Sequence, residues 1–484
     1  MKLFNTLSGV KEELAIPEGR PLRMFVCGPT VYNYIHIGNA RVYAVFDAFV
    51  RYLRSRGINV LYLQNITDLD DKIIERATRE KTTWKAVAKK YERAYHEDIK
   101  ALNIKSVSQY AAATDHMAHI IRQVKLLLRK GHAYEIPGDG IYFDLATFPH
   151  YGELARRTVA QAEDGVSRID ESRHKRNRGD FCLWKFSHAN GAPRGNTKAP
   201  TRMLHEAIWE APFGAGRPGW HIEDTAITEY YFGPQYDIHG GGRDLIFPHH
   251  EAEIAQQEST SGKRPFVRLW MHVGLVTAGG KKMSKSEGNF LFLRDFLPSH
   301  PAEVFRLMAA QTHYRAPLDY TKEAATKAAA ALSGIKEFMA KLALAMRAAT
   351  SKAPSAKHVA LARAEKAFHA ALDDDFNTPE ALAAIFKCIN DLNPRLWKLT
   401  PPETKAIIEW LKEKLGLLGI VLEPPKIPAK IKALAARREA YRSHQQFIPA
   451  DRLRKQIEAL GYRVEDTPHG PLILQKFEIL NSKF

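Results

Sequence analysis

The chain has 484 residues, of which 45% are hydrophobic and 26% charged, and 71 Lys and Arg against 54 Asp and Glu give it a formal net charge of +17. This length exceeds one ordinary hydrophobic core and predicts two to four domains, while the composition excludes a largely disordered chain. The positive charge suits a polyanionic partner, although a generally basic, soluble surface would give the same balance.

The chain has features typical of a soluble protein from a reducing compartment. Its three cysteines exclude a disulfide framework. Residues 1–5 lack the apolar run of a secretory signal, and no stretch reaches the roughly 18 consecutive apolar residues of a membrane span. We therefore expect a cytoplasmic protein that does not enter a membrane.

A strand–helix–strand pattern opens the first predicted domain. Residues 23–27 form a short apolar run that stops at Gly28-Pro29, as a buried strand would. A helix-period segment follows and ends at Gly57, and residues 60–63 are predicted as the next strand. The tetrapeptide His36-Ile37-Gly38-Asn39 falls where the helix begins. A helix start presents unpaired N–H groups and a positive dipole end, so it favours an anion.

A second sheet-and-helix passage is predicted between Trp220 and Val273. Residues 236–239 are predicted as a strand, Gly240-Gly241-Gly242 as a tight loop, and Pro248 as the start of a helix. The stretch between the two passages is predicted to be an insertion.

From about residue 321 the composition changes. Ala, Lys, Leu and Glu dominate as far as Leu418, which predicts a helical bundle. Residues 424–428 are rich in proline and predict a stiff linker. The small terminal module that follows is basic, because residues 430–463 hold nine Lys and Arg against three Asp and Glu.

Two short motifs far apart in the chain point to ATP chemistry. His36 and Asn39 lie three positions apart, so both side chains can face one ligand. Taken alone, this tetrapeptide is better interpreted as a helix-capping cluster. In the second motif, residues 282–286, Lys282 and Lys285 flank Ser284, and two ammonium groups on a loop can close over a pyrophosphate. Its alternative is a solvated basic turn. The order of the two motifs favours ATP binding for both.

These motifs resemble the ATP-handling signatures of class I aminoacyl-tRNA synthetases, and the chain as a whole resembles the cysteinyl-tRNA synthetase family. Further stretches carry this resemblance over essentially the whole length. They are Cys27-Gly28-Pro29-Thr30-Val31-Tyr32, Asn65-Ile66-Thr67-Asp68, residues 214–223, residues 237–250 and Asp373-Asp374-Asp375-Phe376-Asn377-Thr378-Pro379.

The resemblance implies an α/β Rossmann-type catalytic domain with an insertion, followed by an all-α helical bundle and a small C-terminal module. In chain order, the expected parts are the first half of the catalytic domain (1–108), a connective insertion (109–218), the second half of the catalytic domain (219–275), the Lys-Met-Ser-Lys-Ser loop region (276–320), a tRNA-binding helical bundle (321–423) and an anticodon-contacting module (424–484).

The family holds a zinc ion at the base of its amino-acid pocket, and the resemblance assigns three ligands to Cys27, His249 and Glu253. The spacing of His249 and Glu253 puts both on one helical face, as it would for an ordinary hydrogen bond. Asp224 replaces the family's second cysteine. We still expect one zinc ion per chain, because aspartate ligates zinc and carries the formal charge of a thiolate. An oxygen ligand should make the ion a stronger Lewis acid. The alternative is weakened or lost metal binding.

The resemblance also assigns the substrate contacts. Cysteine would contact Gly28, Thr67, Trp220 and His221. ATP, with Mg²⁺, would contact Pro29, Thr30, His36, Gly38, Asn39, Lys282, Ser284 and Lys285. His36, Asn39, Lys282 and Lys285 would stabilise the charge that builds during the reaction. Zinc–thiolate bonding would distinguish cysteine from serine, because an apolar pocket separates such similar side chains by only about 1–3 kcal/mol.

In the terminal module, Arg437, Arg438 and Arg442 follow one predicted helix, with Tyr441 among them. Such a pattern can contact phosphates and stack on bases. The resemblance implies that this region reads the anticodon, where Asp451 could accept hydrogen bonds from a base edge. A solvated helix face is the alternative for each residue.

The predicted function is activation of L-cysteine by ATP as the adenylate, and transfer of the cysteinyl group to tRNA(Cys), by a monomer. One alternative is a cysteine ligase acting on a small-molecule amine, against which the basic terminal module argues. Another is a non-catalytic synthetase paralogue, which Asp224 alone favours.

Overall fold

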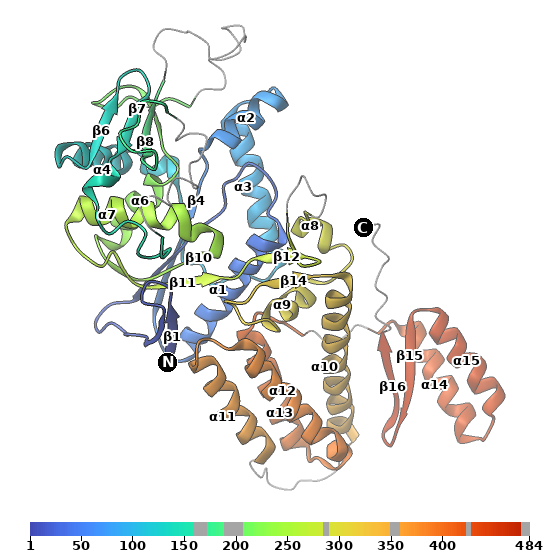
Figure 1. Cartoon of the computed structure of the whole chain (residues 1–484). Helices are drawn as coiled ribbons and strands as arrows, with labels where there is room; N and C mark the ends of the chain where they lie inside the picture. Colours follow the sequence, from blue (N-terminus) through green and yellow to red (C-terminus); the bar gives the residue numbers. More distant parts are fainter. Residues whose placement is uncertain (158–171, 188–206, 284–289, 349–358, 423–426, 476–484) are drawn as a thin grey trace. The chain divides into compact units, whose positions relative to one another are not determined.

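The computed structural model describes residues 1–157, 172–187, 207–283, 290–348, 359–422 and 427–475, without the side chains of Lys282, Arg347 and Ala348 (Figure 1). The chain divides into two compact units. The first comprises Met1–Val276, Ser284–Arg294 and Arg315–Pro317. The second comprises Thr277–Met283, Asp295–Tyr314 and Leu318–Phe484.

A five-stranded parallel sheet forms the centre of the first unit. Its strands lie in the order β11-β10-β3-β4-β5, and every neighbouring pair runs parallel. They are β3 (Leu22–Val26), β4 (Val60–Ile66), β5 (Gln109–Ala112), β10 (Tyr236–Gly242) and β11 (Val267–Val273). Strands β3, β4 and β10 are largely buried, as expected of a parallel sheet covered by helices. The parallel α/β architecture predicted from the sequence is confirmed.

Helix α1 (Ile37–Ser55) connects β3 to β4 and packs against β4, β10 and β11. Its apolar face is buried, with Phe46, Phe49 and Leu53 fully enclosed. The helix ends before Gly57, whose φ of 79° is in the left-handed region that favours glycine. The strand–helix–strand unit predicted around His36 is therefore present, with the tetrapeptide at the start of α1.

The three consecutive glycines Gly240, Gly241 and Gly242, predicted as a tight loop, instead extend β10 to its end. This prediction was wrong because the glycines permit close packing rather than a turn. A Cβ at Gly240 would lie 2.3 Å from the Phe46 ring, and one at Gly241 would lie 2.8 Å from the His250 ring. The strand thus approaches the helix and the histidine more closely than a residue with a side chain would permit.

Several shorter elements surround the parallel sheet. A hairpin of β1 (Lys2–Asn5) and β2 (Val10–Glu13) lies beside β11, where Thr6 N donates to Trp270 O. Helices α2 (Asp71–Glu80) and α3 (Trp84–Ala101) follow β4. Helix α7 (Glu251–Ser261) begins three residues after Pro248, the predicted start, because Ile246–His250 form a separate, wider turn.

The insertion folds around a four-stranded antiparallel sheet in the order β6-β7-β8-β9. Its strands are β6 (Ala133–Ile136), β7 (Gly140–Phe143), β8 (Phe181–Phe186) and β9 (Gly216–Pro218). Helix α4 (Met117–Arg129) precedes this sheet and packs on α6 (Ile222–Phe232) and on α7. Because β5 pairs with β4, the parallel sheet continues four residues past the boundary expected at residue 108.

The second unit contains a small sheet in the order β13-β12-β14 and a bundle of helices. The strands are β12 (Val276–Ala278), β13 (Lys281–Lys282) and β14 (Leu318–Tyr320). The helices are α8 (Leu293–Phe296), α9 (Ala302–Ala310), α10 (Lys322–Ala348), α11 (Val359–Asp373), α12 (Thr378–Leu392) and α13 (Pro401–Leu417). Helix α11 packs on α12, and α10 packs on α9 and α13, so the predicted helical bundle is confirmed.

A small module closes the described chain. It consists of α14 (Ala429–Ser443), α15 (Phe447–Ala459), β15 (Tyr462–Thr467) and β16 (Gly470–Gln475), with the two strands paired antiparallel. Ile431, Ala435, Ile457 and Val464 form its core. Across the described parts of both units, no helix combines the length and apolarity needed to cross a membrane.

Candidate active site and metal centre

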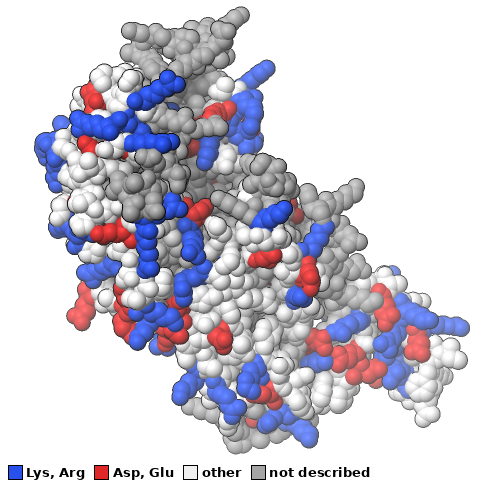
Figure 2. Space-filling model, in the orientation of Figure 1, with Lys and Arg blue, Asp and Glu red and all other residues white. Residues whose placement is uncertain are grey.

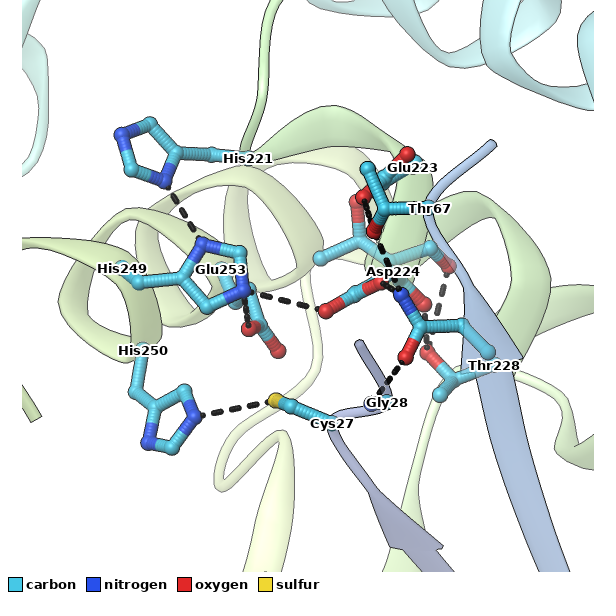
Figure 3. A network of polar contacts seen from close by, with 12 residues as sticks. Cys27, Gly28, Thr67, His221, Glu223, Asp224, Thr228, His249, His250 and Glu253 are labelled. Atoms are coloured by element: carbon cyan, nitrogen blue, oxygen red, sulfur yellow. Dashed lines mark hydrogen bonds and ion pairs between the residues drawn. The ribbon is translucent and has the colours of Figure 1, made fainter. Parts of the chain in front are cut away.

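Cys27 lies directly after β3, at the carboxyl edge of the parallel sheet (Figure 3). Ligands of open α/β sheets bind at this edge. Its Sγ lies 3.2 Å from His250 Nε2 and 3.4 Å from His239 Nε2, and the residue is 5% exposed. The thiol therefore faces a buried polar cluster rather than the apolar core.

The four ligands expected from the sequence come together around this thiol. Cys27, Asp224, His249 and Glu253 each offer one ligand atom, and these atoms lie within 4.8 Å of one another. His249 Nε2 lies 3.0 Å from Asp224 Oδ2 and 3.1 Å from Glu253 Oε1. The four side chains come from three places: the end of β3, the first turn of α6, and the start of α7 with the turn before it. Asp224 thus occupies a position from which it can ligate a metal.

Two further histidines form a second possible ligand group with the same thiol. Cys27, His239, His250 and Glu253 also place their ligand atoms within 4.8 Å of one another. The second nitrogen of each ring has its own polar partner, which fixes the orientation of the ring. His239 Nδ1 lies 2.6 Å from the Tyr236 hydroxyl. His250 Nδ1 lies 2.8 Å from the Nε2 atom of a third histidine, His272. The cluster therefore offers two imidazole nitrogens in addition to the four ligand atoms that the sequence predicted.

The electrostatics of this cluster are those of a site built for a cation. Burial, and then the carboxylates of Glu253 and Asp224, raise the pKa of the Cys27 thiol well above its ordinary value. Burial and the neighbouring Asp224 likewise raise the pKa of Glu253 and of Glu223. Among the described residues, neither carboxylate oxygen of Glu253 accepts a well-formed hydrogen bond, although both atoms are buried. Buried acidic groups are stabilised by pairing or by coordinating a metal.

The residues expected to bind cysteine lie around the same cluster, and two of them contact His249. The Trp220 ring stacks on the His249 ring with centroids 4.3 Å apart. His221 Nδ1 lies 2.8 Å from His249 Nδ1, on the opposite side of that ring from Asp224 and Glu253. Thr67 is buried and its hydroxyl donates to Glu223. Trp220 and His221 therefore fix the orientation of a predicted metal ligand.

The first ATP motif forms the start of α1. His36 is the N-cap residue, and its Nδ1 accepts from Gly38 N at 3.0 Å and from Asn39 N at 3.4 Å. The helix-capping interpretation therefore holds for His36, and it also fixes the orientation of the ring. Thr30, directly after Pro29, forms an isolated parallel bridge with Thr67 at the same edge of the sheet. The predicted ATP contacts of this motif thus lie beside the predicted cysteine pocket.

The second ATP motif is only partly described. The backbone of Lys282 pairs with Thr277 in the β12–β13 hairpin, while Ser284, Lys285 and the Lys282 side chain lie outside the description. The segment just beyond the motif returns to the first unit. There His36 forms an isolated antiparallel bridge with Phe292, and the Phe290 ring meets the His36 ring edge-on, with centroids 5.1 Å apart.

The arginines predicted to bind tRNA differ in their surroundings. Arg437 is exposed, and so is Asp451. Arg438 is 1% exposed and donates to both carboxylate oxygens of Asp466, at 2.6 and 2.9 Å. Its assignment as a tRNA contact was wrong, because the helix turns it toward β15. Arg442 lies 3.3 Å from the same carboxylate and is 35% exposed.

Sequence reasoning missed an aromatic side chain in this module. Phe447, at the start of α15, is 54% exposed, and the guanidinium of Arg442 lies over its ring. Figure 2 shows Lys and Arg side chains on the face of the module that is in view, mixed with acidic ones. The available signal was the polar stretch between the two predicted helices, in which the aromatic Phe447 follows Gln445-Gln446 and precedes Pro449.

Sequence reasoning also missed polar residues within the catalytic centre. Four residues lie within the stretches that resemble the family, but the sequence assigned them no role: Asn65, Glu223, His239 and His250. Two of them had a signal in their position, because Asn65 lies two residues after the predicted second strand and His239 ends the third. Polar residues at the carboxyl ends of parallel strands gather at one edge of the sheet.

Comparison with known proteins agrees with this geometry. Residues 14–330 match the family model of the tRNA synthetases class I (C) catalytic domain, and residues 367–423 match the DALR domain. The fold is similar to that of Mycobacterium tuberculosis methionyl-tRNA synthetase in complex with methionyl-adenylate, with a TM-score of 0.57 and 16% identity over 83% of this chain and 90% of that one. It is also similar to Agrobacterium radiobacter LeuRS in its ternary complex, with a TM-score of 0.61 and 12% identity over 83% and 84% of the two chains.

The catalytic-domain match and the parallel sheet with two ATP motifs define a class I aminoacyl-tRNA synthetase, with a Rossmann-type catalytic domain followed by a helical region. Among curated relatives, the cysteine--tRNA ligase of Thermococcus onnurineus is 40% identical over 98% of both chains. That of Heliobacterium modesticaldum is 39% identical over 97% of this chain and 98% of its own. The chain belongs to the cysteine--tRNA ligase family.

Family membership establishes the reaction. The enzyme activates cysteine with ATP and transfers it to tRNA, so ATP, the amino acid and tRNA are its partners. Because the relatives align over the whole chain, including the helical region, the small-molecule ligase and the non-catalytic paralogue are not favoured.

Proposed function

We propose that Cys27, Asp224, His249 and Glu253 hold one zinc ion that selects the cysteine substrate. The observation that carries this proposal is the buried Glu253 carboxylate, whose two oxygens lack a well-formed hydrogen bond among the described residues. The nearest partners of these oxygens are two histidine nitrogens, His249 Nε2 at 3.1 Å and His239 Nδ1 at 3.5 Å, and a buried carboxylate with so little compensation costs roughly several kcal/mol unless a cation balances it. The donor set of one thiol, one imidazole and two carboxylates is also one that zinc accepts.

Zinc held by these residues would supply a Lewis acid that binds the substrate's sulfur in preference to a serine hydroxyl. The surrounding side chains keep the ligands in place. Trp220 and His221 fix the His249 ring, so its Nε2 points toward Asp224 and Glu253. Gly28 presents its backbone beside Cys27, and Thr67 forms a further polar wall. Together these residues would admit a small side chain and exclude bulk water.

For the first half-reaction, we assign ATP to the start of α1. The positive dipole end of this helix, together with the side chains of His36 and Asn39, would attract and bind the triphosphate, with Gly38 allowing close approach. Pro29 and Thr30 would form the adjoining wall, and Mg²⁺ would accompany the phosphates. Lys282, Ser284 and Lys285 would close over the leaving pyrophosphate.

The chemistry then follows from positioning and charge. The cysteine carboxylate attacks the α-phosphorus, the bond to the pyrophosphate oxygen breaks, and cysteinyl adenylate remains. His36 and Lys285 would stabilise the negative charge that builds on the phosphate oxygens. In the second half-reaction, a terminal ribose hydroxyl of tRNA(Cys) attacks the acyl carbon and AMP leaves.

For tRNA recognition, we assign the anticodon to the C-terminal module. Arg437 and Arg442 would contact phosphates, and Asp451 would accept hydrogen bonds from a base edge. The exposed Phe447 ring would stack on a base, an interaction worth about 1–3 kcal/mol. Arg438 has no part in this assignment, because Asp466 holds it inside the module. We further propose that the enzyme acts as a monomer in the cytoplasm, where its product serves translation.

One experiment tests the site as a whole. Pyrophosphate exchange is measured with cysteine and with serine, and zinc is measured on the same purified sample. We expect exchange with cysteine, far less with serine, and about one zinc per chain, as in a four-ligand site. Protein that selects cysteine while free of metal would overturn the zinc assignment without affecting the family.

A further inference from the structure

We infer that Asn65 is a positioning residue that makes Asp224 a one-oxygen ligand for the metal. This inference rests on the proposed zinc site and names a residue to which sequence reasoning gave no role. Asn65 lies near the end of β4 and is 2% exposed, while Asp224 is 1% exposed. Their side chains meet although 159 positions separate them in sequence, with Asn65 Nδ2 lying 2.6 Å from Asp224 Oδ1.

The orientation of the Asn65 amide follows from its hydrogen bonds. Its Oδ1 accepts the backbone N–H of Gly28 at 2.6 Å, so this atom must be the oxygen. The amide NH₂ group therefore points the other way, where its two donors meet Asp224 Oδ1 and, at 3.2 Å, Thr67 Oγ1. Every hydrogen-bonding atom of this amide is paired, and the group has no alternative orientation with the same number of bonds.

This contact divides the two oxygens of Asp224 between two tasks. Oδ1 is held by the amide, while Oδ2 lies 3.0 Å from His249 Nε2, the ligand atom expected of that histidine. A thiolate offers a single donor atom, whereas a carboxylate offers two and can rotate to bind through both. The hydrogen bond from Asn65 to one oxygen restrains the rotation of the carboxylate. Asp224 can therefore take the place of a thiolate without supplying a fifth ligand atom.

Asn65 also connects the Asp224 side chain to the backbone next to Cys27. Gly28 follows the ligand Cys27, and a Cβ at Gly28 would lie 1.7 Å from the Asn65 carbonyl oxygen, so the two backbones are in close contact. Asn65 therefore spans from the residue after one predicted ligand to the carboxylate of another. Neighbours of metal ligands that orient them in this way affect metal affinity by about 10–100-fold.

The test is a double-mutant cycle on the full chain with zinc retention as its readout. Wild type, Asn65→Ala, Asp224→Cys and the double variant are loaded with zinc and titrated with a chromophoric chelator. We expect Asn65→Ala to weaken zinc retention about 10–100-fold when residue 224 is aspartate. In the Asp224→Cys background the same change should cost much less, because a thiolate has no second oxygen to restrain. Equal losses in both backgrounds, or no loss in the first, would overturn the inference.

A second variant covers a failure of Asn65→Ala to fold. Asn65→Asp keeps the acceptor for Gly28 N but replaces the donor with a carboxylate oxygen that repels Asp224. It should retain zinc at least as poorly as Asn65→Ala, and zinc retention equal to wild type would contradict the inference. Loading with Co²⁺ adds a readout of ligand geometry, because its visible absorption should change on Asn65→Asp only when residue 224 is aspartate.

The cycle also separates this inference from the zinc assignment itself. If the wild-type chain retains no zinc under any loading condition, the proposed metal site fails, and the role of Asn65 fails with it. If the wild type retains zinc and the cycle shows no coupling, the metal site stands and only the role of Asn65 is overturned.

Discussion

The backbone of His36 pairs with that of Phe292 in an antiparallel bridge, and Ile37 N donates to Leu291 O at 3.1 Å beside it. The chain that leaves the second ATP motif is thus attached to the residue that starts the first. The orientation of His36 should therefore depend on the segment Phe290–Phe292 that follows this motif.

The Phe290 ring offers a test of this attachment, because it meets the His36 ring edge-on. Phe290→Ala should raise the KM for ATP several-fold in cysteine-dependent pyrophosphate exchange, since the His36 imidazole loses a fixed neighbour. Phe290→Tyr keeps the ring and should restore the wild-type value. An unchanged KM in the alanine variant would show that the contact does not position ATP.

His36 caps α1, and we expect it to take part in catalysis as well; two substitutions separate these roles. Asn is among the best N-cap residues, so His36→Asn should preserve the melting temperature while lowering exchange by about 10²–10³-fold, the usual cost of a lost transition-state donor. His36→Ala should lose as much activity and, in addition, about 1 kcal/mol of stability. If His36→Asn kept full activity, the residue would serve only as a cap.

Removal of zinc should abolish the selection of cysteine as the substrate. Dialysis against a chelator should remove cysteine-dependent exchange, and zinc should restore it. Asp224→Cys should still bind about one zinc per chain, since a thiolate matches the aspartate in charge. Exchange by that variant should remain measurable, and its complete loss would mean that residue 224 is not a ligand position. Zinc measurement on the same samples separates loss of metal from loss of activity.

Arg437 and Arg438 are neighbours in sequence with opposite surroundings, so they form a matched pair. Arg437→Gln should weaken tRNA binding and lower the slope of affinity against salt concentration by about one unit, as expected for one lost phosphate contact. Arg438→Gln should instead lower the melting temperature, because it leaves Asp466 without its two-point partner. Salt-dependent filter binding and thermal unfolding measure the two effects. The reverse pattern would restore Arg438 to the tRNA-binding surface.

The partly buried ion pair between Arg20 and Asp237, at the amino end of β10, should make the free energy of unfolding depend on pH. Burial alone would raise the pKa of Asp237, but hydrogen bonds from the Arg20 guanidinium and the Arg23 amide outweigh it and hold that pKa below its usual value. A lowered pKa means that the charged form stabilises the fold above the unfolded-state pKa of about 3.9 and that this contribution is lost as pH falls further.

Asp237→Asn should therefore lower the free energy of unfolding by about 1.5–3 kcal/mol at pH 7, the scale for hydrogen bonds to a charged group, because the partly exposed Arg20 can be solvated when its partner is lost. The difference from wild type should shrink as pH falls below about 4. Asp115→Asn, at an exposed position, is the matched control and should change neither value. A difference that is constant with pH would mean that Asp237 acts through packing.

Much of the fold could be inferred from the sequence, since apolar periodicity locates strands and helices. The four residues expected to bind zinc do lie together, although His249 stands in the turn before α7 rather than on that helix. Long-range pairing could not be inferred. Nothing in the neighbourhood of Asn65 indicates that its amide meets Asp224, and nothing near Arg438 indicates that Asp466 turns it inward. Gly240 to Gly242 were misassigned for a related reason, because a glycine that makes room for a ring looks the same in sequence as one that makes a turn.

The use of aspartate at residue 224 also bears on oxidative damage. A metal site with two thiolates can lose its ion when an oxidant joins the two sulfurs in a disulfide. Here Cys27 is the only sulfur in either ligand group, and it is almost completely buried. Within the two ligand groups that the described residues form, a second thiol would come from the substrate itself. An enzyme built in this way should keep its metal under peroxide exposure that would strip a two-cysteine site.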